Sequence, residues 1–123
     1  MAFDDFRKMN VWQLSVKLVK QIYSLTNSFP ADERFGLISD MRRAANSIAH
    51  NIAEGFGRYE PKDKTRFYKI SRGSCFEIMS QILVSKELGF IQSDEIIWQI
   101  TEDCKKIIEE LNTIIKTLET RKF

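Results

Sequence analysis

The amino-acid sequence predicts one all-α domain over residues 1–123, folded as an antiparallel up-down-up-down four-helix bundle. Apolar residues recur every three or four positions through most of the chain, which is the period of helices that share a core. Two prolines and five glycines are too few for the many turns of a β-rich fold. Because the expected connections are short, neighbouring helices should run in opposite directions.

The first predicted helix begins at Asn10, a candidate N-cap, and ends near Ser28 because Pro30 cannot continue it. Its apolar residues form two adjacent stripes that together cover about 200° of arc, whereas a single core requires roughly 100°. The stripe expected to face the core contains Val11, Leu14, Leu18, Ile22, Leu25 and Phe29. The second stripe contains Trp12, Val16, Val19 and Tyr23.

The second predicted helix begins at Asp32 or Phe35 and ends at Phe56, before the glycines of GFGR. Arg42 lies beside an edge of small residues that lets another helix approach closely, so its side chain should be partly buried. A partly buried guanidinium is expected to meet a carboxylate, and Glu77 is the candidate partner in a structural ion pair. The expected core face contains Ile38, Met41, Ala45, Ile48, Ile52 and Phe56, and the small edge contains Ala45, Ala49 and Ala53.

Pro61 suits the first turn of a third helix, which continues to Leu88 and ends at the cap residue Gly89. Ser93 is the expected N-cap of a fourth helix. The third helix has an expected core line of Phe67, Ile70, Ser74, Ile78 and Ile82. The fourth has an expected seam of Ile97, Ile100, Cys104, Ile107, Leu111, Ile114 and Leu118, which Ile108 and Ile115 broaden.

The first and third helices carry more apolar surface than one small bundle can bury, because the third helix also has a second apolar patch. Such a surplus on a soluble chain indicates self-association, although singly exposed apolar residues are common on protein surfaces. The expected homo-oligomer interface contains Trp12, Val16, Val19, Tyr23, Phe76, Met79 and Leu83.

The two cysteines, Cys75 and Cys104, occupy apolar helical positions and form no Cys-x-x-Cys pair. Buried free thiols in a reducing compartment are therefore expected rather than a disulfide. The N-terminal sequence does not have the pattern of a signal peptide, and no apolar run approaches the ~18 residues of a membrane span. The expected location is the cytoplasm, without contact with a membrane.

An enzymatic function is not expected. His50 and Glu54 lie on one helix face with Arg43, where an acid–base pair is one interpretation and a solvated histidine–glutamate contact is the other. We favour the solvated contact because no nucleophile or pocket accompanies it. A single histidine cannot supply a carboxylate-bridged di-iron site, and Gly-x-Gly without a preceding strand does not indicate a phosphate loop. No catalytic residue, metal or cofactor is therefore predicted.

Positive charge concentrates in the middle of the chain, since residues 34–72 hold nine Lys and Arg against four Asp and Glu. Such a cationic strip can neutralise phosphates without reading base sequence. A solvated charged face is the alternative interpretation. The candidate nucleic-acid-binding residues are Arg43, Arg58, Lys62, Arg66, Lys69 and Arg72.

A series of motifs resembles one known family over nearly the whole chain. It comprises Trp12, Phe29–Pro30, Gly36–Leu37, the Arg-Arg-Ala-Ala run Arg42–Ala45, the Asn-Ile-Ala-Glu-Gly run Asn51–Gly55, and the Gly-Ser-x-x-Glu residues Gly73, Ser74 and Glu77. With this series the chain is similar to the four-helix-bundle proteins named after 23S rRNA intervening sequences.

The resemblance implies assembly as a homopentamer. It also implies a relation to the accessory variability determinant of diversity-generating retroelements, a basic pentameric barrel that binds a reverse transcriptase and nucleic acid. The leading hypothesis is a non-enzymatic homo-oligomer that acts as an accessory or scaffold protein on RNA or DNA. A structural or protein–protein interaction module without nucleic-acid binding is the alternative, in which the basic strip serves solubility or an acidic protein partner.

Overall fold

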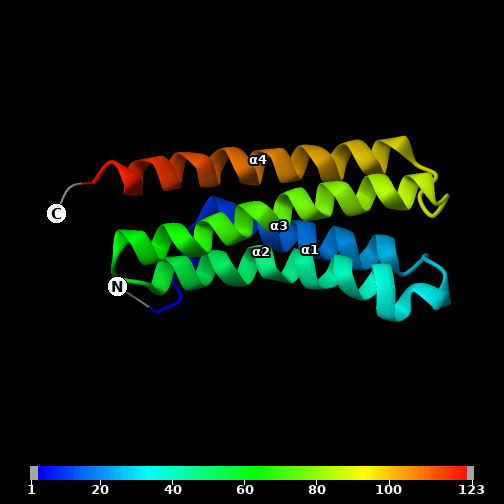
Figure 1. The fold of residues 1–123 in the computed structure, drawn as a ribbon, viewed down its shortest axis with the longest axis horizontal. Helices are drawn as coiled ribbons and strands as arrows, with labels where there is room; N and C mark the ends of the chain where they lie inside the picture. The colour runs from blue at the N-terminus through cyan, green and yellow to red at the C-terminus, as the bar shows by residue number, and fades with distance from the viewer. Residues whose placement is uncertain (1–2, 122–123) are drawn as a thin grey trace.

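The computed structural model describes residues 3–121 and shows four long helices that lie along a common axis (Figure 1). No strand occurs within these residues, so the all-α prediction is confirmed. The connection between the second and third helices lies at the same end of the bundle as the start of the first helix and the end of the fourth. The helices are α1 (Asn10–Thr26), α2 (Ser39–Gly57), α3 (Pro61–Glu87) and α4 (Asp94–Glu119).

The α-helical part of α2 begins later than the sequence indicated. A short 3-10 turn (Ala31–Glu33) and a wide π-type turn (Arg34–Ile38) come first, and α2 begins at Ser39. Gly36 lies within the wide turn with φ −113° and ψ −109°, which is not a helical conformation. This break separates the entry turns from the regular helix, so neither Asp32 nor Phe35 begins it.

The start of α1 is held differently from the expectation. Met9 occupies the N-cap position with an extended backbone, and Asn10 is already helical. The expected Asn10 cap is therefore wrong, because the Asn10 amide instead donates a hydrogen bond to Glu110 of α4. Farther along α1, Lys17 Nζ lies 3.3 Å from Oδ2 of Asp103, a buried carboxylate of α4.

The caps at the connection between α3 and α4 follow the sequence prediction. Gly89 has φ +80°, a left-handed backbone conformation that residues with a side chain rarely adopt. Ser93 Oγ accepts a hydrogen bond of 3.2 Å from the backbone N–H of Ile96. These two residues let α3 end and α4 begin within a short connection.

α2 packs closely on α3 near the end of α2. A methyl group added at Gly55 would lie 2.7 Å from a ring carbon of Tyr68, so the ring occupies the space that a side chain at position 55 would need. Tyr68 is buried, and burial raises the pKa of its hydroxyl to about 12. One helical turn on, Ser71 Oγ donates a 2.9 Å hydrogen bond to the carbonyl of Ile48.

The residues that α3 buries in its first half differ from those predicted from the sequence. Ile70 is 42% exposed and Phe67 is only partly buried, so both expected core positions lie at the edge of the interface. Their place in the core is taken by the next residue along the chain in each case. The buried positions of α3 are Thr65, Tyr68, Ser71, Ser74, Cys75, Ile78, Ile82 and Ser85.

The cores of the other helices largely match the predicted faces. Ile97 and Ile114 are partly buried, and Ile115 takes a core position on α4.

Cys75 and Cys104 are buried free thiols, as expected. Burial, and then the nearby carboxylate of Asp103, raise the pKa of Cys104 to about 12, so this thiol stays protonated at neutral pH.

The surplus apolar surface is distributed unevenly between the two predicted patches. On α1, Trp12 and Val19 pack against the chain's own core, and Phe6 meets the Trp12 ring edge-on at 5.3 Å between centroids. On α3, Phe76 and Leu83 are 55% and 56% exposed. Further exposed apolar side chains that the sequence analysis did not single out are Val84, Leu88 and Trp98. The second half of α3 therefore carries one group of uncovered apolar side chains. Others within the residues described include Tyr23 on α1 and Trp98 on α4.

None of the helices described in residues 3–121 is long and apolar enough to cross a membrane.

Substitution of Gly55 by Ala should destabilise the protein by about 1–3 kcal/mol, because the added methyl group clashes with the Tyr68 ring. Gly73→Ala is the matched control, since a methyl group at this α3 position would extend into open space. It should stabilise by about 0.5–1 kcal/mol through helix propensity. Urea denaturation followed by circular dichroism measures both changes. Equal effects of the two substitutions would contradict the close packing at Gly55.

Candidate nucleic-acid interface

Five of the six predicted phosphate-binding residues lie together on the turn between α2 and α3 and on the first half of α3. Arg43 is the exception. It lies on α2 and pairs with Glu77, which is five residues beyond Arg72 on α3 and therefore farther from the turn than the other five residues. The structure therefore does not bring Arg43 to the group formed by Arg58, Lys62, Arg66, Lys69 and Arg72.

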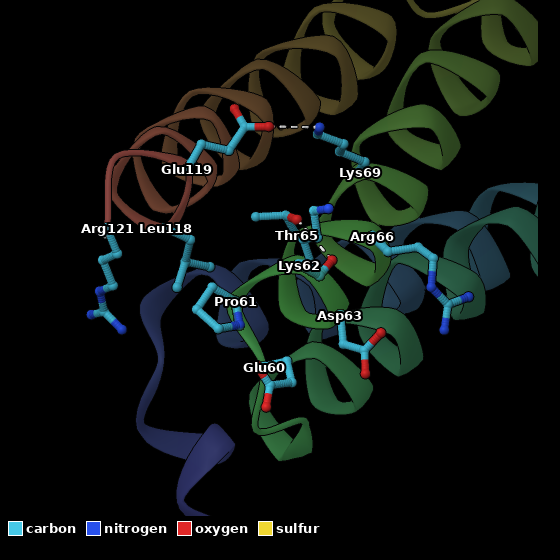
Figure 2. A pocket seen from close by; sticks show the side chains of 10 residues that line it. All are labelled: Glu60, Pro61, Lys62, Asp63, Thr65, Arg66, Lys69, Leu118, Glu119 and Arg121. Carbon is cyan, nitrogen blue, oxygen red and sulfur yellow. Dashed lines mark hydrogen bonds and ion pairs between the residues drawn. The ribbon is translucent and has the colours of Figure 1, made fainter. Parts of the chain in front are cut away.

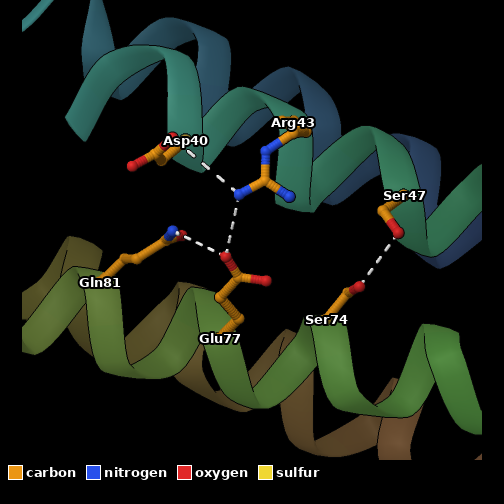
Figure 3. A network of polar contacts seen from close by, with 6 residues as sticks. All are labelled: Asp40, Arg43, Ser47, Ser74, Glu77 and Gln81. Carbon is orange, nitrogen blue, oxygen red and sulfur yellow. Dashed lines mark hydrogen bonds and ion pairs between the residues drawn. The ribbon is translucent and has the colours of Figure 1, made fainter. Parts of the chain in front are cut away.

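Arg43 belongs instead to a polar network between α2 and α3 (Figure 3). Its Nη2 lies 3.3 Å from Glu77 Oε2 and 3.9 Å from Asp40 Oδ1. Gln81 Nε2 also donates to Glu77 Oε2, at 3.3 Å. The charge of Arg43 is thus shared with two carboxylates of the bundle.

The predicted ion pair between Arg42 and Glu77 is wrong, because α2 directs Arg42 toward α1 and leaves Glu77 to Arg43. Arg42 is half-buried as expected, but its acceptors are neutral. Nε donates to Thr26 Oγ1 at 2.9 Å, and Nη2 donates to Asn27 Oδ1 at 3.1 Å. The guanidinium also stacks over the Tyr23 ring at 4.5 Å.

These contacts place a cation at the C-terminal end of α1, where the helix dipole favours positive charge. Sequence reasoning missed this arrangement because it considered only carboxylates as partners for a buried arginine. The signal was present in the polar side chains of Thr26 and Asn27, which follow Tyr23 at helical spacing.

Three members of the basic group already have polar partners. Arg58 Nη2 lies 3.3 Å from Glu54 Oε2, and Lys69 Nζ lies 2.8 Å from Glu119 Oε2. Arg72 donates a 2.8 Å hydrogen bond to the neutral side chain of Asn112. Exposed ion pairs of this kind contribute at most about 1 kcal/mol to stability, so they restrain the side chains only weakly. The carboxylates nevertheless reduce the local positive potential.

Lys62 and Arg66 differ from these residues. Both are exposed, and neither forms an ion pair with any carboxylate in residues 3–121. They line a cavity of about 890 Å³ at the end of the bundle, where α3 begins and α4 ends (Figure 2). Lys69 and Arg121 also line it, together with the carboxylates of Glu60, Asp63 and Glu119. We call this region the cationic end.

Aromatic stacking orders two arginines beside this cavity. The guanidinium of Arg58 lies 4.6 Å from the centre of the Phe67 ring, and that of Arg66 lies 4.4 Å from the same centre. Such cation–π contacts are worth roughly 0.5–1 kcal/mol at exposed sites. These contacts hold both guanidinium groups near the start of α3. Arg58, in the turn before α3, therefore lies beside the same ring as Arg66, which lines the cavity.

Two further cations at this end were not singled out from the sequence. Lys64 turns back from α3 and donates to the carbonyls of Gly55 and Phe56 at 3.2 and 2.8 Å, which satisfies the last turn of α2. Burial, and then the positive charge of Arg121, lower the pKa of Lys64. Lys64 is therefore a structural residue, whereas Arg121 adds charge to the cavity. The position of Arg121 depends on tertiary packing, so no sequence pattern marked it.

The pair considered for acid–base chemistry does not interact as that interpretation required. His50 is exposed on α2, and Glu54 forms its ion pair with Arg58. Within residues 3–121, no cluster of three or more His, Cys, Asp or Glu is arranged to hold a metal ion. His50 and Glu54 are surface residues beside a shallow depression that also touches Gly57 and Arg58.

The fold and this surface define a class, an all-helical protein of four long helices with a cation-rich cavity at one end. The chain belongs to the 23S rRNA-intervening sequence protein family, whose sequence model matches residues 7–117. This membership confirms the family resemblance drawn from the motifs.

A solved structure supports the fold. The chain is similar to a Bacteroides thetaiotaomicron VPI-5482 protein of unknown function from the S23 ribosomal protein family, with a TM-score of 0.77 at 20% sequence identity. The match covers 86% of this chain and 95% of that one. No curated protein matches this chain.

Replacement of Arg42 by Ala should destabilise the protein by about 1.5–3 kcal/mol, because it removes several charge-assisted hydrogen bonds that join α1 to α2. Arg43→Ala is the matched control, since its ion pairs are exposed and should contribute less than about 1 kcal/mol. Denaturant midpoints of the two variants and the parent protein give the comparison. A larger loss at Arg43 than at Arg42 would contradict these assigned contacts.

Proposed function

We propose that this protein is a non-enzymatic, cytoplasmic accessory or scaffold protein that contacts the phosphates of RNA or DNA through its cationic end. The observation that carries the proposal is the pair Lys62 and Arg66, which form no ion pair with a carboxylate within residues 3–121. Both residues line a cavity with two further cations, Lys69 and Arg121. A phosphate can bind an exposed cation of this kind without first breaking an existing ion pair.

The proposed subunit is an antiparallel up-down-up-down bundle that assembles into a homopentamer. Contacts of Lys69 with Glu119 and of Lys86 with Asp94 support opposite directions for α3 and α4, since they join opposite ends of the two sequences. The exposed apolar side chains of α3 support self-association, because burial of such surface is favourable. Assembly would repeat the cationic end in each subunit and raise the avidity for a long polyanion.

A reverse transcriptase or another acidic protein is the partner proposed from the relation to retroelement accessory proteins. The second candidate function is a structural or protein–protein interaction module without nucleic-acid binding. The ion pairs of Arg43, Arg58 and Lys69 favour this alternative, because they leave few unbalanced cations. The apolar side chains of Phe76, Leu83 and Leu88 offer it a contact surface.

Charge reversal at the cationic end tests the nucleic-acid proposal. The double substitution Lys62→Glu with Arg66→Glu should weaken binding of a fluorescent RNA or DNA oligonucleotide about tenfold or more at low salt, and should flatten the dependence of affinity on salt. Fluorescence anisotropy at several salt concentrations provides the measurement. Lys69 is left unchanged so that its ion pair with Glu119 stays intact.

The matched control is Lys20→Glu with Lys105→Glu, which changes the net charge equally at exposed positions of α1 and α4. This control should lose much less affinity if the cationic end is the binding site. Absence of oligonucleotide binding by the parent protein in dilute salt would refute the proposal and favour the interaction module.

Self-association is tested by Leu83→Glu, which places a charge within the exposed apolar surface of α3. Light scattering after size-exclusion chromatography should show an oligomer for the parent protein and a smaller species for this variant, because burying an unpaired carboxylate is costly. Tyr59→Glu is the control, since Tyr59 is 91% exposed and lies at the connection between α2 and α3, at the other end of the bundle. A parent protein with the mass of one subunit would contradict the proposed assembly.

A further inference from the structure

We infer that the cationic end binds single-stranded rather than duplex nucleic acid, with a base stacked on Tyr59 and phosphates held by Lys62 and Arg66. This inference rests on the proposed function and specifies its ligand. It follows from an exposed aromatic ring, two stacked arginines and the carboxylates that lie among the cations.

Tyr59 provides an uncovered ring at the connection between α2 and α3. Its side chain is 91% exposed, although it is adjacent in sequence to Arg58 and three residues before Lys62. An unpaired base can stack on such a ring, and this contact tolerates any base sequence because every base has a flat π-face. Bases inside a duplex are already stacked on one another and cannot reach it.

Phe67 and its two arginines add further planar groups at the same end. The Phe67 ring has Arg58 and Arg66 guanidiniums at 4.6 and 4.4 Å from its centre. Guanidinium planes also accept stacked bases in single-stranded RNA recognition. Because Arg66 makes no ion pair in the described residues, its hydrogen-bond donors can contact a phosphate while Phe67 fixes its orientation.

The carboxylates of the cavity favour an unpaired strand over a duplex, because they can accept hydrogen bonds from unpaired bases. Glu60, Asp63 and Glu119 line the cavity with the cations (Figure 2). Carboxylates repel the phosphates of either form, and a duplex offers them only the amino hydrogens that remain free in its major groove. A single strand exposes all of its amino and imino N–H groups, which can donate hydrogen bonds to carboxylates.

The extent of the cationic end agrees with a short strand. Lys62 and Lys69 are separated by about 10 Å along α3 at the rise of an α-helix. Proteins that recognise double-stranded RNA by shape contact about 16 base pairs across successive grooves. Within one subunit the cations do not extend over such a length, whereas a short segment of an extended strand fits the spacing.

The experiment compares a labelled 12-nucleotide single strand with a hairpin of matched composition whose loop is a non-nucleotide linker, so that it holds no unpaired base, each made as RNA and as DNA. Fluorescence anisotropy with the full chain at low salt should show the single strand bound at least about tenfold more tightly than the hairpin. Tyr59→Ser should weaken single-strand binding about tenfold and leave hairpin binding unchanged, because stacking is lost. Tyr59→Phe should keep the parent affinity. Comparison of the RNA and DNA arms shows whether the sugar contributes.

Phe35→Ser is the matched control, since this equally exposed ring lies before α2 and away from the cationic end. It should leave both affinities unchanged. Equal affinity for strand and hairpin, or no effect of Tyr59→Ser, would overturn this inference while the charge-reversal result upholds the proposed function. Absence of binding to every oligonucleotide would refute the proposed function and this inference together.

Discussion

The close packing of α2 on α3 at Gly55 and Tyr68 is the constraint on which the rest of the structure depends. A side chain at position 55 would occupy the space of the Tyr68 ring, so glycine permits the observed separation of the two helices. The same packing sets the rotation of α3, because Tyr68 and Ser71 face inward and Phe67 is left at the edge. Phe67 is thereby available to the two arginines that flank the cationic end.

The distribution of charge depends on this rotation. Arg43 meets Glu77 across the interface, and Lys64 turns toward the last carbonyls of α2. These cations support the fold, while Lys62 and Arg66 stay exposed beside the cavity. The basic stretch of the sequence therefore separates into residues that hold helices together and residues that can contact a ligand.

Much of the fold could be predicted from the sequence, because local rules decide helix formation and capping. The helical period, the left-handed Gly89 and the Ser93 cap were all anticipated. Arg42 was expected to be partly buried, but its partner could not be identified. Its contact with Thr26 requires the relative rotation of α1 and α2, which depends on packing between residues distant in the chain. The same reason explains why the contribution of Arg121 to the cavity was missed.

The sequence by itself determined an all-helical chain with surplus apolar residues and a basic middle, because composition and periodicity are properties of the chain alone. Only the tertiary structure decided that Trp12 is covered largely by the chain's own residues and that Phe76 and Leu83 are left exposed. It also decided which positive charges have carboxylate partners. Ion pairs and the burial of a second apolar stripe depend on which helices become neighbours and how they are rotated, and helical spacing does not specify either.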